Sequence, residues 1–222
     1  MSKHLQNDLE SLKKTIIMMG EDVEDRVYRA TLSIIRKDGD MARNIIESDA
    51  EIDKMEVEFE EKCLSLLALY QPVAIDLRFI IASLKINNEL ERVGDLAVNI
   101  AERSAFLATQ DGIEIPFDLG GMALTAESML TASIDALVNL DAKLAYRIRT
   151  EDDRVDKLNR EMYEKIKDEI QKDPEHINIL LHALSVGRHL ERIADHATNI
   201  AEDVIYLVDA EIVRHTPEVF EE

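Results

Sequence analysis

The stretch Leu84–Glu102 has the sequence LKINNELERVGDLAVNIAE, and it returns one hundred residues later, at Leu184–Glu202, as LSVGRHLERIADHATNIAE. Ten of the twenty positions from Ser83 and Ala183 onward are identical. Two unrelated helices would not share this many residues in register. We therefore interpret the chain as a duplicated unit.

The duplication extends upstream of this stretch with a slightly different offset. Moving the chain by 103 residues aligns Asp49–Lys54 with Asp152–Lys157. A three-residue difference near Gln71-Pro72 reconciles the two offsets, at a place where a turn between helices tolerates an insertion. The sequence therefore predicts a first repeat over residues 1–109, a connector over 110–121 and a second repeat over 122–222.

Each repeat is expected to hold three long helices. The 222 residues include only seven Gly and four Pro, no Trp and 5% aromatic residues, so turn-forming and strand-favouring residues are few. Five breaks divide the chain into six helical segments of roughly 20 to 35 residues. They fall at Asp38-Gly39-Asp40, Gln71-Pro72, Gln110–Gly121, Asn139-Leu140-Asp141 and Asp173-Pro174. The expected fold is all-α, with two tandem, sequence-related three-helix bundles.

The charge balance restricts the kinds of partner that the chain can bind. With 26 Lys plus Arg against 46 Asp plus Glu, the net charge is −20, which predicts repulsion from nucleic acid and anionic lipid. Cations or basic partners are expected instead. Cys63, the single cysteine, permits no internal disulfide and is expected to be a buried structural thiol. With no secretory signal or membrane-spanning stretch at hand, a cytoplasmic protein is expected.

Acidic and amide side chains recur at four-residue spacing in both repeats. Residues four apart on a helix differ by about 40° in direction, so each set lies on one face of its helix. In the first half the sets are Asp49 and Asp53, then Glu91, Asp95 and Asn99. In the second half they are Asp152 and Asp156, then Glu191, Asp195 and Asn199. Two helices of each half can thus present carboxylates to each other.

Clustered carboxylates repel one another unless something neutralises them. Oxygen ligands suit hard cations such as Mg, Mn, Ca or Fe, and Arg92 and Arg192 are alternative sources of positive charge beside the ligands. The alternative interpretation is a solvated acidic face, which is less expected when the same residues occur in both halves. A helical wheel places the acids away from the apolar arc, so the sites are expected at the bundle surface.

Signatures of catalysis are missing from the sequence. The chain has no Glu-x-x-His ligand pair, no Gly-rich phosphate loop, no Gly-x-Ser-x-Gly turn and no paired Cys ligands. His182, His189 and His196 fall at the edge of the apolar arc, well away from Glu191. An inter-helix or subunit contact, or exposure, is expected of them rather than metal ligation, and a non-enzyme is expected overall.

The duplicated Leu-Glu-Arg-[Val/Ile]-[Gly/Ala]-Asp motif, preceded by an Asp-x-x-x-Asp pair in each half, resembles the PhoU family of phosphate-regulon regulators. The resemblance covers essentially the whole chain and includes the segment Gln71–Arg78. It implies a cytoplasmic, all-α adaptor, often a homodimer, that reaches the inner membrane only through its partners. The second repeat lacks the Gln-Pro-x-x-x-Asp-Leu-Arg segment, so the two halves need not be equivalent.

The resemblance also implies multinuclear metal clusters on the bundle surface. Iron is the metal most associated with the family, and zinc, manganese or magnesium are further options. One implied site comprises Asp49, Asp53, Glu91 and Asp95. The other comprises Asp152, Asp156, Glu191 and Asp195. Asn99 and Asn199 are additional candidate ligands.

The function implied by the resemblance is negative regulation of phosphate uptake and signalling. Such a protein links the phosphate ABC transporter, at its cytoplasmic ATPase, to the phosphate-sensing histidine kinase. Two alternatives stay open at this stage: an accessory protein of a low-affinity phosphate transporter, and a carboxylate-bridged metal hydrolase or oxidase.

Overall fold

The computed structural model describes residues 3–48, 50–110 and 115–214, and in these ranges it contains helices and no strands. The helices are α1 Lys3–Arg36, α2 Gly39–Glu47, α3 Ala50–Tyr70, α4 Ala74–Leu107, α5 Leu119–Asn139, α6 Ala142–Lys172 and α7 Ile177–Asp209, with a short 3₁₀ turn at Pro174–His176. Six of the helices are long, as expected. The all-α prediction is confirmed.

Aspartate caps begin several helices at the predicted breaks. The Asp38 carboxylate accepts hydrogen bonds from the Asp40 and Met41 amides at 3.1 and 2.9 Å, and starts α2. Asp141 accepts from the Leu144 amide at 3.0 Å and starts α6, directly after Leu140, which caps the end of α5 with a left-handed φ of 53°. These side chains satisfy amides that have no partner within the first helical turn.

The segment expected as one helix from about residue 41 to Tyr70 is two helices, α2 and α3. The break follows Ser48, which caps α2 by donating its hydroxyl to the Ile45 carbonyl at 2.9 Å. Arg26, buried in α1, donates to the Ser48 carbonyl at 2.7 Å. The corresponding helix of the second half, α6, runs without interruption over 31 residues. A tertiary hydrogen bond from α1 therefore stabilises a break that occurs only in the first half.

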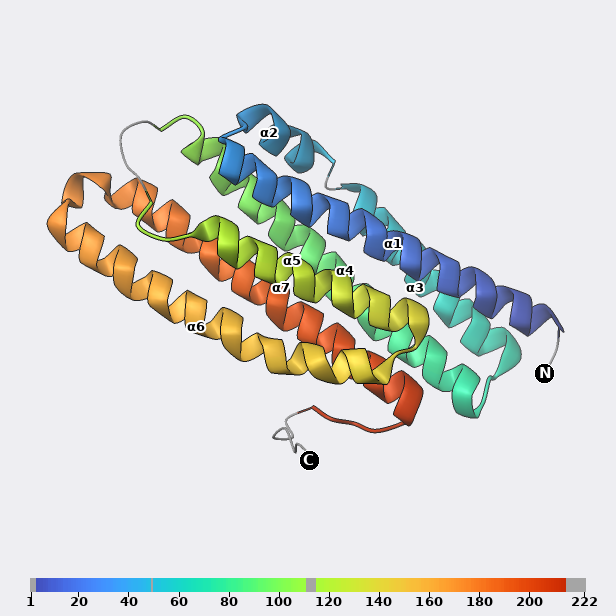
Figure 1. The fold of residues 1–222 in the computed structure, drawn as a ribbon. Coiled ribbons are helices and arrows are strands. Elements are labelled where there is room, and N and C mark those ends of the chain that lie inside the picture. Colours follow the sequence, from blue (N-terminus) through green and yellow to red (C-terminus); the bar gives the residue numbers. More distant parts are fainter. Residues whose placement is uncertain (1–2, 49, 111–114, 215–222) are drawn as a thin grey trace, which may run out of the picture.

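The two halves lie side by side as elongated bundles, α1 to α4 in one and α5 to α7 in the other (Figure 1). Helices α4 and α7, which carry the repeated motif, pack together most extensively, and α1 packs on α5. Helices α4 and α7 run antiparallel, because Lys85 pairs with Asp203 near one end and Phe106 stacks on His182 near the other. One continuous apolar core spans both halves.

The repeat is visible in the burial pattern as well as in the sequence. The ten residues 91–100 and the ten residues 191–200 show the same order of exposed, half-buried and buried positions. In both copies the apolar positions enter the core, while the Glu and Asp of the motif keep access to solvent. This agrees with the expectation of tandem, related bundles.

Gly187 allows α6 and α7 to approach closely, because a Cβ at this position would collide with the thioether of buried Met162. The clashing atoms are the end of the Met162 side chain, so the cost is that of shifting this buried thioether, less the roughly 1 kcal/mol that alanine gains over glycine inside a helix. We expect Gly187→Ala to lower the free energy of unfolding by about 1 kcal/mol, measured by urea denaturation. Gly39→Ala, where a Cβ would meet its neighbours at 3.5 Å, is the control and should be nearly neutral. A neutral Gly187→Ala would contradict this packing.

Candidate metal centre

Three carboxylates of the first half converge between α3 and α4. Asp53 of α3 and Glu91 and Asp95 of α4 each offer one oxygen, and these oxygens all lie within 4.8 Å of one another. Asp53 and Asp95 are exposed, and Glu91 is half-buried. The cluster is thus at the bundle surface, as the helical wheel predicts. Among the described residues, this is the one acidic group that meets so close a spacing.

A close helix contact brings these side chains together. Gly94 lies on α4 between Glu91 and Asp95, and a Cβ there would be 3.2 Å from the Ile52 side chain of α3. Ile52 is buried, so its neighbour Asp53 is directed to the edge of the same contact. In the second half Ala194 and Val155 occupy the corresponding positions, both fully buried. The larger Ile52 is thus paired with Gly94 in the first half, and the smaller Val155 is paired with Ala194 in the second half. The combined size of the two residues is therefore similar in both halves.

The crowding of negative charge raises the affinity of these carboxylates for protons. Burial raises the pKa of Glu91, and the charge of Asp95 raises it further. The pKa of Glu56 is also raised, first by burial and then by the charges of Glu60 and Asp53. Each of these groups would become easier to ionise beside a cation. The electrostatics therefore favour an added positive charge at this surface.

Glu56 is a member of the first cluster that the sequence analysis missed. Its charge raises the pKa of Glu91, which places it beside the predicted ligands. The signal in the sequence is its position three residues after Asp53, on the same face of α3. The repeat comparison does not select it, because Asn159 occupies the equivalent place in the second half.

The second half gathers its four predicted acids between α6 and α7. Burial raises the pKa of Asp152 to about 6, and the charges of Asp195 and Asp156 contribute. Burial likewise raises the pKa of Glu191, with Asp156 and Asp152 adding to it. Burial also raises the pKa of Asp195, and Glu191 raises it further. These mutual effects mean that the four carboxylates are neighbours.

Positive charge lies beside both clusters. Arg92 is 3.9 Å from Glu89 through Nη1 and Oε1, and its charge partly offsets the raised pKa of Glu91. Arg192 has the same effect on the pKa of Asp195, whose largest perturbation is burial. Both arginines are exposed. Each arginine thus lowers the pKa of one neighbouring acid from the edge of its cluster.

The two asparagines are engaged outside the carboxylate clusters. Asn99 donates to the main-chain oxygen of Asp95 at 2.8 Å. Asn199 donates to Glu89 of the other half at 3.0 Å. Asp49, the remaining predicted ligand, lies outside the described residues. Of the eight carboxylates assigned to the two sites, three thus converge within 4.8 Å in the first half, and the four of the second half lie near enough to raise one another's pKa without meeting that spacing.

Glu89 is a second residue that the sequence analysis missed, and it joins the two halves. Its carboxylate lies 2.7 Å from Nδ1 of His196 and accepts the hydrogen bond from Asn199. Burial alone would raise the pKa of Glu89, but these hydrogen bonds lower it below its usual value. His182 stacks on Phe106 with ring centroids 3.8 Å apart. The inter-helix role expected of these histidines is thus confirmed for His182 and His196.

Cys63 is fully buried, as expected of a structural thiol. Burial raises its pKa to about 12, so the thiol stays protonated at neutral pH. A buried, protonated thiol of this kind packs as a small apolar side chain and is a weak nucleophile.

All the clustered donors are carboxylate oxygens, the ligands that hard cations prefer. Two helices of each half supply these oxygens, and solvent reaches both acidic clusters. The residues therefore fit surface metal sites, in which bound cations would neutralise the acids and offer open coordination positions to a partner.

Comparisons with known proteins agree with this architecture. The PhoU domain family matches residues 16–104 and 119–204, one domain in each half. A phosphate-specific transport system accessory protein PhoU homolog of Aquifex aeolicus is 37% identical over 211 residues, covering 95% of this chain and 96% of the relative. The corresponding Pseudomonas aeruginosa homolog is 35% identical, over 96% of this chain and 89% of its own length.

Solved structures give the same result in three dimensions. The crystal structure of PhoU from Pseudomonas aeruginosa superposes with a TM-score of 0.89 at 34% identity, covering 93% of this chain and 99% of that one. The phosphate transport system regulatory protein PhoU from Streptococcus pneumoniae has a TM-score of 0.86 at 31% identity, with 94% and 99% covered. With both halves matched and the duplicated helices in place, the chain belongs to the PhoU family.

Proposed function

We propose that this protein is an accessory protein of a phosphate-specific transport system and a negative regulator of phosphate uptake and phosphate-regulon signalling. The observation that carries the proposal is similarity over essentially the whole chain, in both halves, to proteins named as accessory proteins of a phosphate-specific transport system. The proposed partners are the cytoplasmic ATPase of the phosphate ABC transporter and the phosphate-sensing histidine kinase. A homodimer in the cytoplasm is part of the same proposal.

We further propose that the two acidic clusters hold multinuclear metal sites, with iron first and zinc, manganese or magnesium as alternatives. The donor set supports this, because Asp53, Glu91 and Asp95 each bring a carboxylate oxygen within 4.8 Å of the others at the surface. The raised pKa of Asp152, caused first by burial and then by Asp195 and Asp156, supports the second site. Bound cations would serve as a docking face rather than a catalytic centre.

The test of the regulatory role is deletion of the gene with alkaline phosphatase as the reporter. With abundant phosphate, the deletion strain is expected to express alkaline phosphatase at least about tenfold above wild type. The reason is that loss of a repressive interaction worth only about 1.4 kcal/mol already changes the corresponding equilibrium constant tenfold. The wild-type gene on a plasmid should restore repression. Unchanged repression in the deletion strain would overturn the proposal and favour a low-affinity transporter accessory. Turnover of a phosphate compound that depends on Asp95 would favour a hydrolase.

A further inference from the structure

The two acidic clusters differ in how closely their carboxylates approach one another. In the first half, oxygens of Asp53, Glu91 and Asp95 meet within 4.8 Å, whereas the four acids of the second half do not reach this spacing. The Glu and Asp of the motif and the acids of the preceding helix occur in both halves. The difference in spacing therefore originates in residues that the two halves do not share.

Asn87 of α4 is such a residue, and it lies about one helical turn before Glu91. Its side chain is fully buried, and its Nδ2 donates a hydrogen bond to the main-chain oxygen of Glu56 on α3 at 3.1 Å. The corresponding residue of the second half is Gly187, which has no side chain that could make this bond. Gly187 instead faces the thioether of Met162, a flexible apolar contact without a preferred direction. A directional contact of the first half is thus replaced by a non-directional one.

Two contacts between α3 and α4 lie on either side of the converging acids. On one side Ile52 packs against Gly94, and on the other side Asn87 makes its hydrogen bond to α3. Asp53 and Glu91 lie between these two contacts along their helices. A hydrogen bond has a narrow range of length and angle, so it restricts sliding of α3 along α4 more than an apolar contact does. A slide of half a helical turn, about 2.7 Å, would already move the carboxylates apart by a comparable distance.

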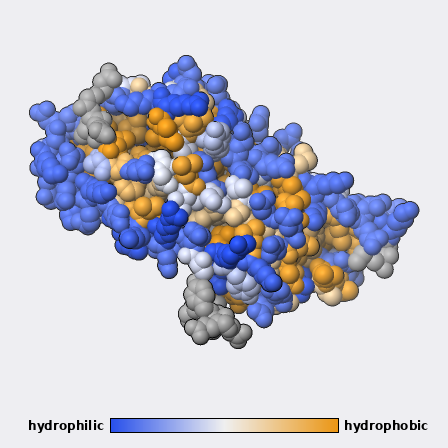
Figure 2. Space-filling model, viewed as in Figure 1, coloured by the Kyte–Doolittle hydropathy of each residue, from blue (hydrophilic) through white to orange (hydrophobic). Residues whose placement is uncertain are grey.

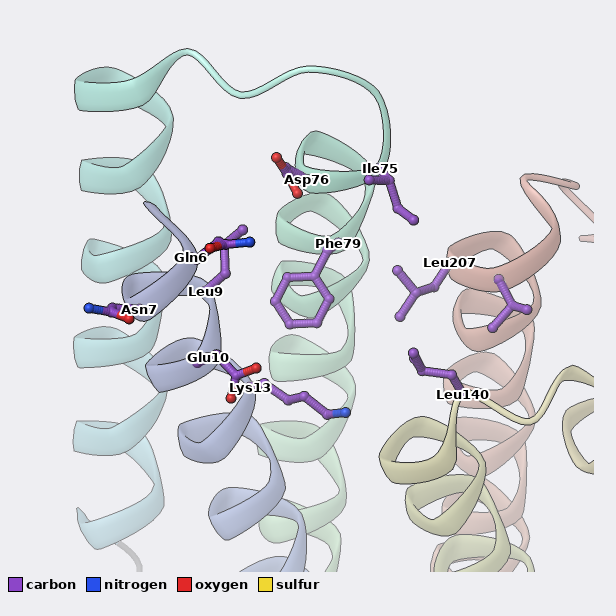
Figure 3. Close-up of a pocket in the computed structure, with 11 residues that line it drawn as sticks. Gln6, Asn7, Leu9, Glu10, Lys13, Ile75, Asp76, Phe79, Leu140 and Leu207 are labelled. Carbon is purple, nitrogen blue, oxygen red and sulfur yellow. The ribbon is translucent and has the colours of Figure 1, made fainter. Parts of the chain in front are cut away.

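The far end of the α3–α4 pair is less closely packed. A hollow of about 680 Å³ opens beside the first turns of α4, where Ile75 and Phe79 face Leu207 of α7 across it (Figure 3). Apolar surface is visible at this end of the molecule in Figure 2. Tyr70, at the end of α3, donates to Asp8 at 2.9 Å, which holds α3 on α1 and not on α4. The contacts beside the acids therefore matter more for the alignment of α3 with α4.

Stability alone does not explain an asparagine at position 87. The Nδ2 atom must face the Glu56 carbonyl, because a carbonyl oxygen only accepts hydrogen bonds. The Oδ1 atom is then buried without a hydrogen-bond partner among the residues that the structure describes. A buried amide oxygen in this state destabilises the fold, and an apolar side chain of similar size would avoid that cost. The hydrogen bond from Asn87 to α3 offers a functional reason for the residue.

We propose that Asn87 is a positioning residue, which aligns α3 with α4 and makes the first acidic cluster the tighter of the two metal sites. The inference rests on the proposed metal sites and adds that they are unequal. Ligands held in place before the cation arrives lose less freedom when it binds. Residues that orient metal ligands change the affinity about 10–100-fold, so we expect the first site to bind a divalent cation about tenfold more tightly than the second.

The test is isothermal titration calorimetry of the metal-free full chain with Mn²⁺. The Asp195→Ala protein reports the first site alone, and the Asp95→Ala protein reports the second. We expect the Asp195→Ala protein to have a dissociation constant about tenfold below that of the Asp95→Ala protein. Adding Asn87→Ala to Asp195→Ala should raise the constant about tenfold, to the value of the second site. Asn87→Leu, which keeps the number of side-chain heavy atoms, should have the same effect.

A destabilising control separates positioning from general loosening of the fold. Ile80 is fully buried in α4 and lies 11 residues before Glu91, so Ile80→Ala leaves a cavity away from the acids. In the Asp195→Ala background, Ile80→Ala should lower the midpoint of urea unfolding more than Asn87→Ala does, yet change Mn²⁺ affinity less than about twofold.

The outcomes distinguish this inference from the metal sites on which it rests. If both single variants bind Mn²⁺ but with equal affinity, or if Asn87→Ala has no effect, the positioning role is wrong while the metal sites stand. An equal loss of affinity in Ile80→Ala would also overturn it. Absence of Mn²⁺ binding in both single variants would overturn the metal sites themselves, and the inference with them.

Discussion

Protein purified without chelator is expected to retain metal that the Asp95→Ala plus Asp195→Ala variant loses. Asp95 is one of three carboxylates that converge within 4.8 Å, and Asp195 is its counterpart in the second half. Loss of residues that only orient metal ligands costs about 10–100-fold in affinity, and loss of a ligand should cost at least as much. Elemental analysis should therefore find metal in the double variant near background.

The single variants make this prediction specific to each half. Asp95→Ala should remove only the metal bound between α3 and α4, and Asp195→Ala only the metal bound between α6 and α7. The control is Asp22→Ala plus Asp168→Ala, which removes two exposed acids from other helix positions and should keep the wild-type metal content. If the Asp95→Ala plus Asp195→Ala protein keeps that content as well, our ligand assignment is wrong.

Most of the fold could be predicted because its determinants are local. Helix breaks at Asp38 and Asp141 depend on side-chain caps within three residues, and the repeat marks corresponding helices in the two halves. The break after Ser48 could not be predicted in this way. It is stabilised by Arg26, which lies 22 residues earlier on another helix. Tertiary contacts of this kind have no periodic signal in the sequence.

The difference between repeated, local patterns and tertiary contacts also explains which residues of the candidate sites the sequence analysis identified. Asp53, Glu91 and Asp95 occur in both halves at helical spacing, so the repeat comparison selected them. Glu56 and Glu89 are the important residues that it missed, and both lie where the halves differ. Glu89 corresponds to His189 in the second half, and its partners His196 and Asn199 belong to the other motif helix. A comparison that seeks symmetry is insensitive to contacts made between the symmetric units.

Charge summed over the whole chain indicates which class of ligand to look for, but not where it would bind. The net charge of −20 reflects an excess of acids, part of which is concentrated in the first cluster. The position of that cluster follows from the helical spacing of the repeated acids and not from the total.

In the metal-free protein, Asp152→Asn is expected to raise the melting temperature at about pH 7 and to have little effect at about pH 4. Burial and the charges of Asp195 and Asp156 raise the pKa of Asp152 from 3.8 to about 6 in the folded state. Folding therefore favours the protonated form. Stability from this group is present below the unfolded pKa and is lost as the pH rises through the folded pKa. The control is Asp168→Asn, which removes an exposed acid farther along α6 that does not act on Asp152, and it should show no such window.

Saturating Mn²⁺ should reverse this pH dependence, because metal and protons compete for the same oxygens. At a concentration about 100 times the dissociation constant, a bound ion stabilises the folded state by about 2.7 kcal/mol. For a chain of this length, each kcal/mol raises the melting temperature by about 2–4 °C, so each site should contribute about 5–10 °C near pH 7. The gain should be smaller at acidic pH and smaller in Asp152→Asn. Differential scanning calorimetry measures both effects, and a metal-induced rise that is the same at all pH values would show that the cations bind elsewhere.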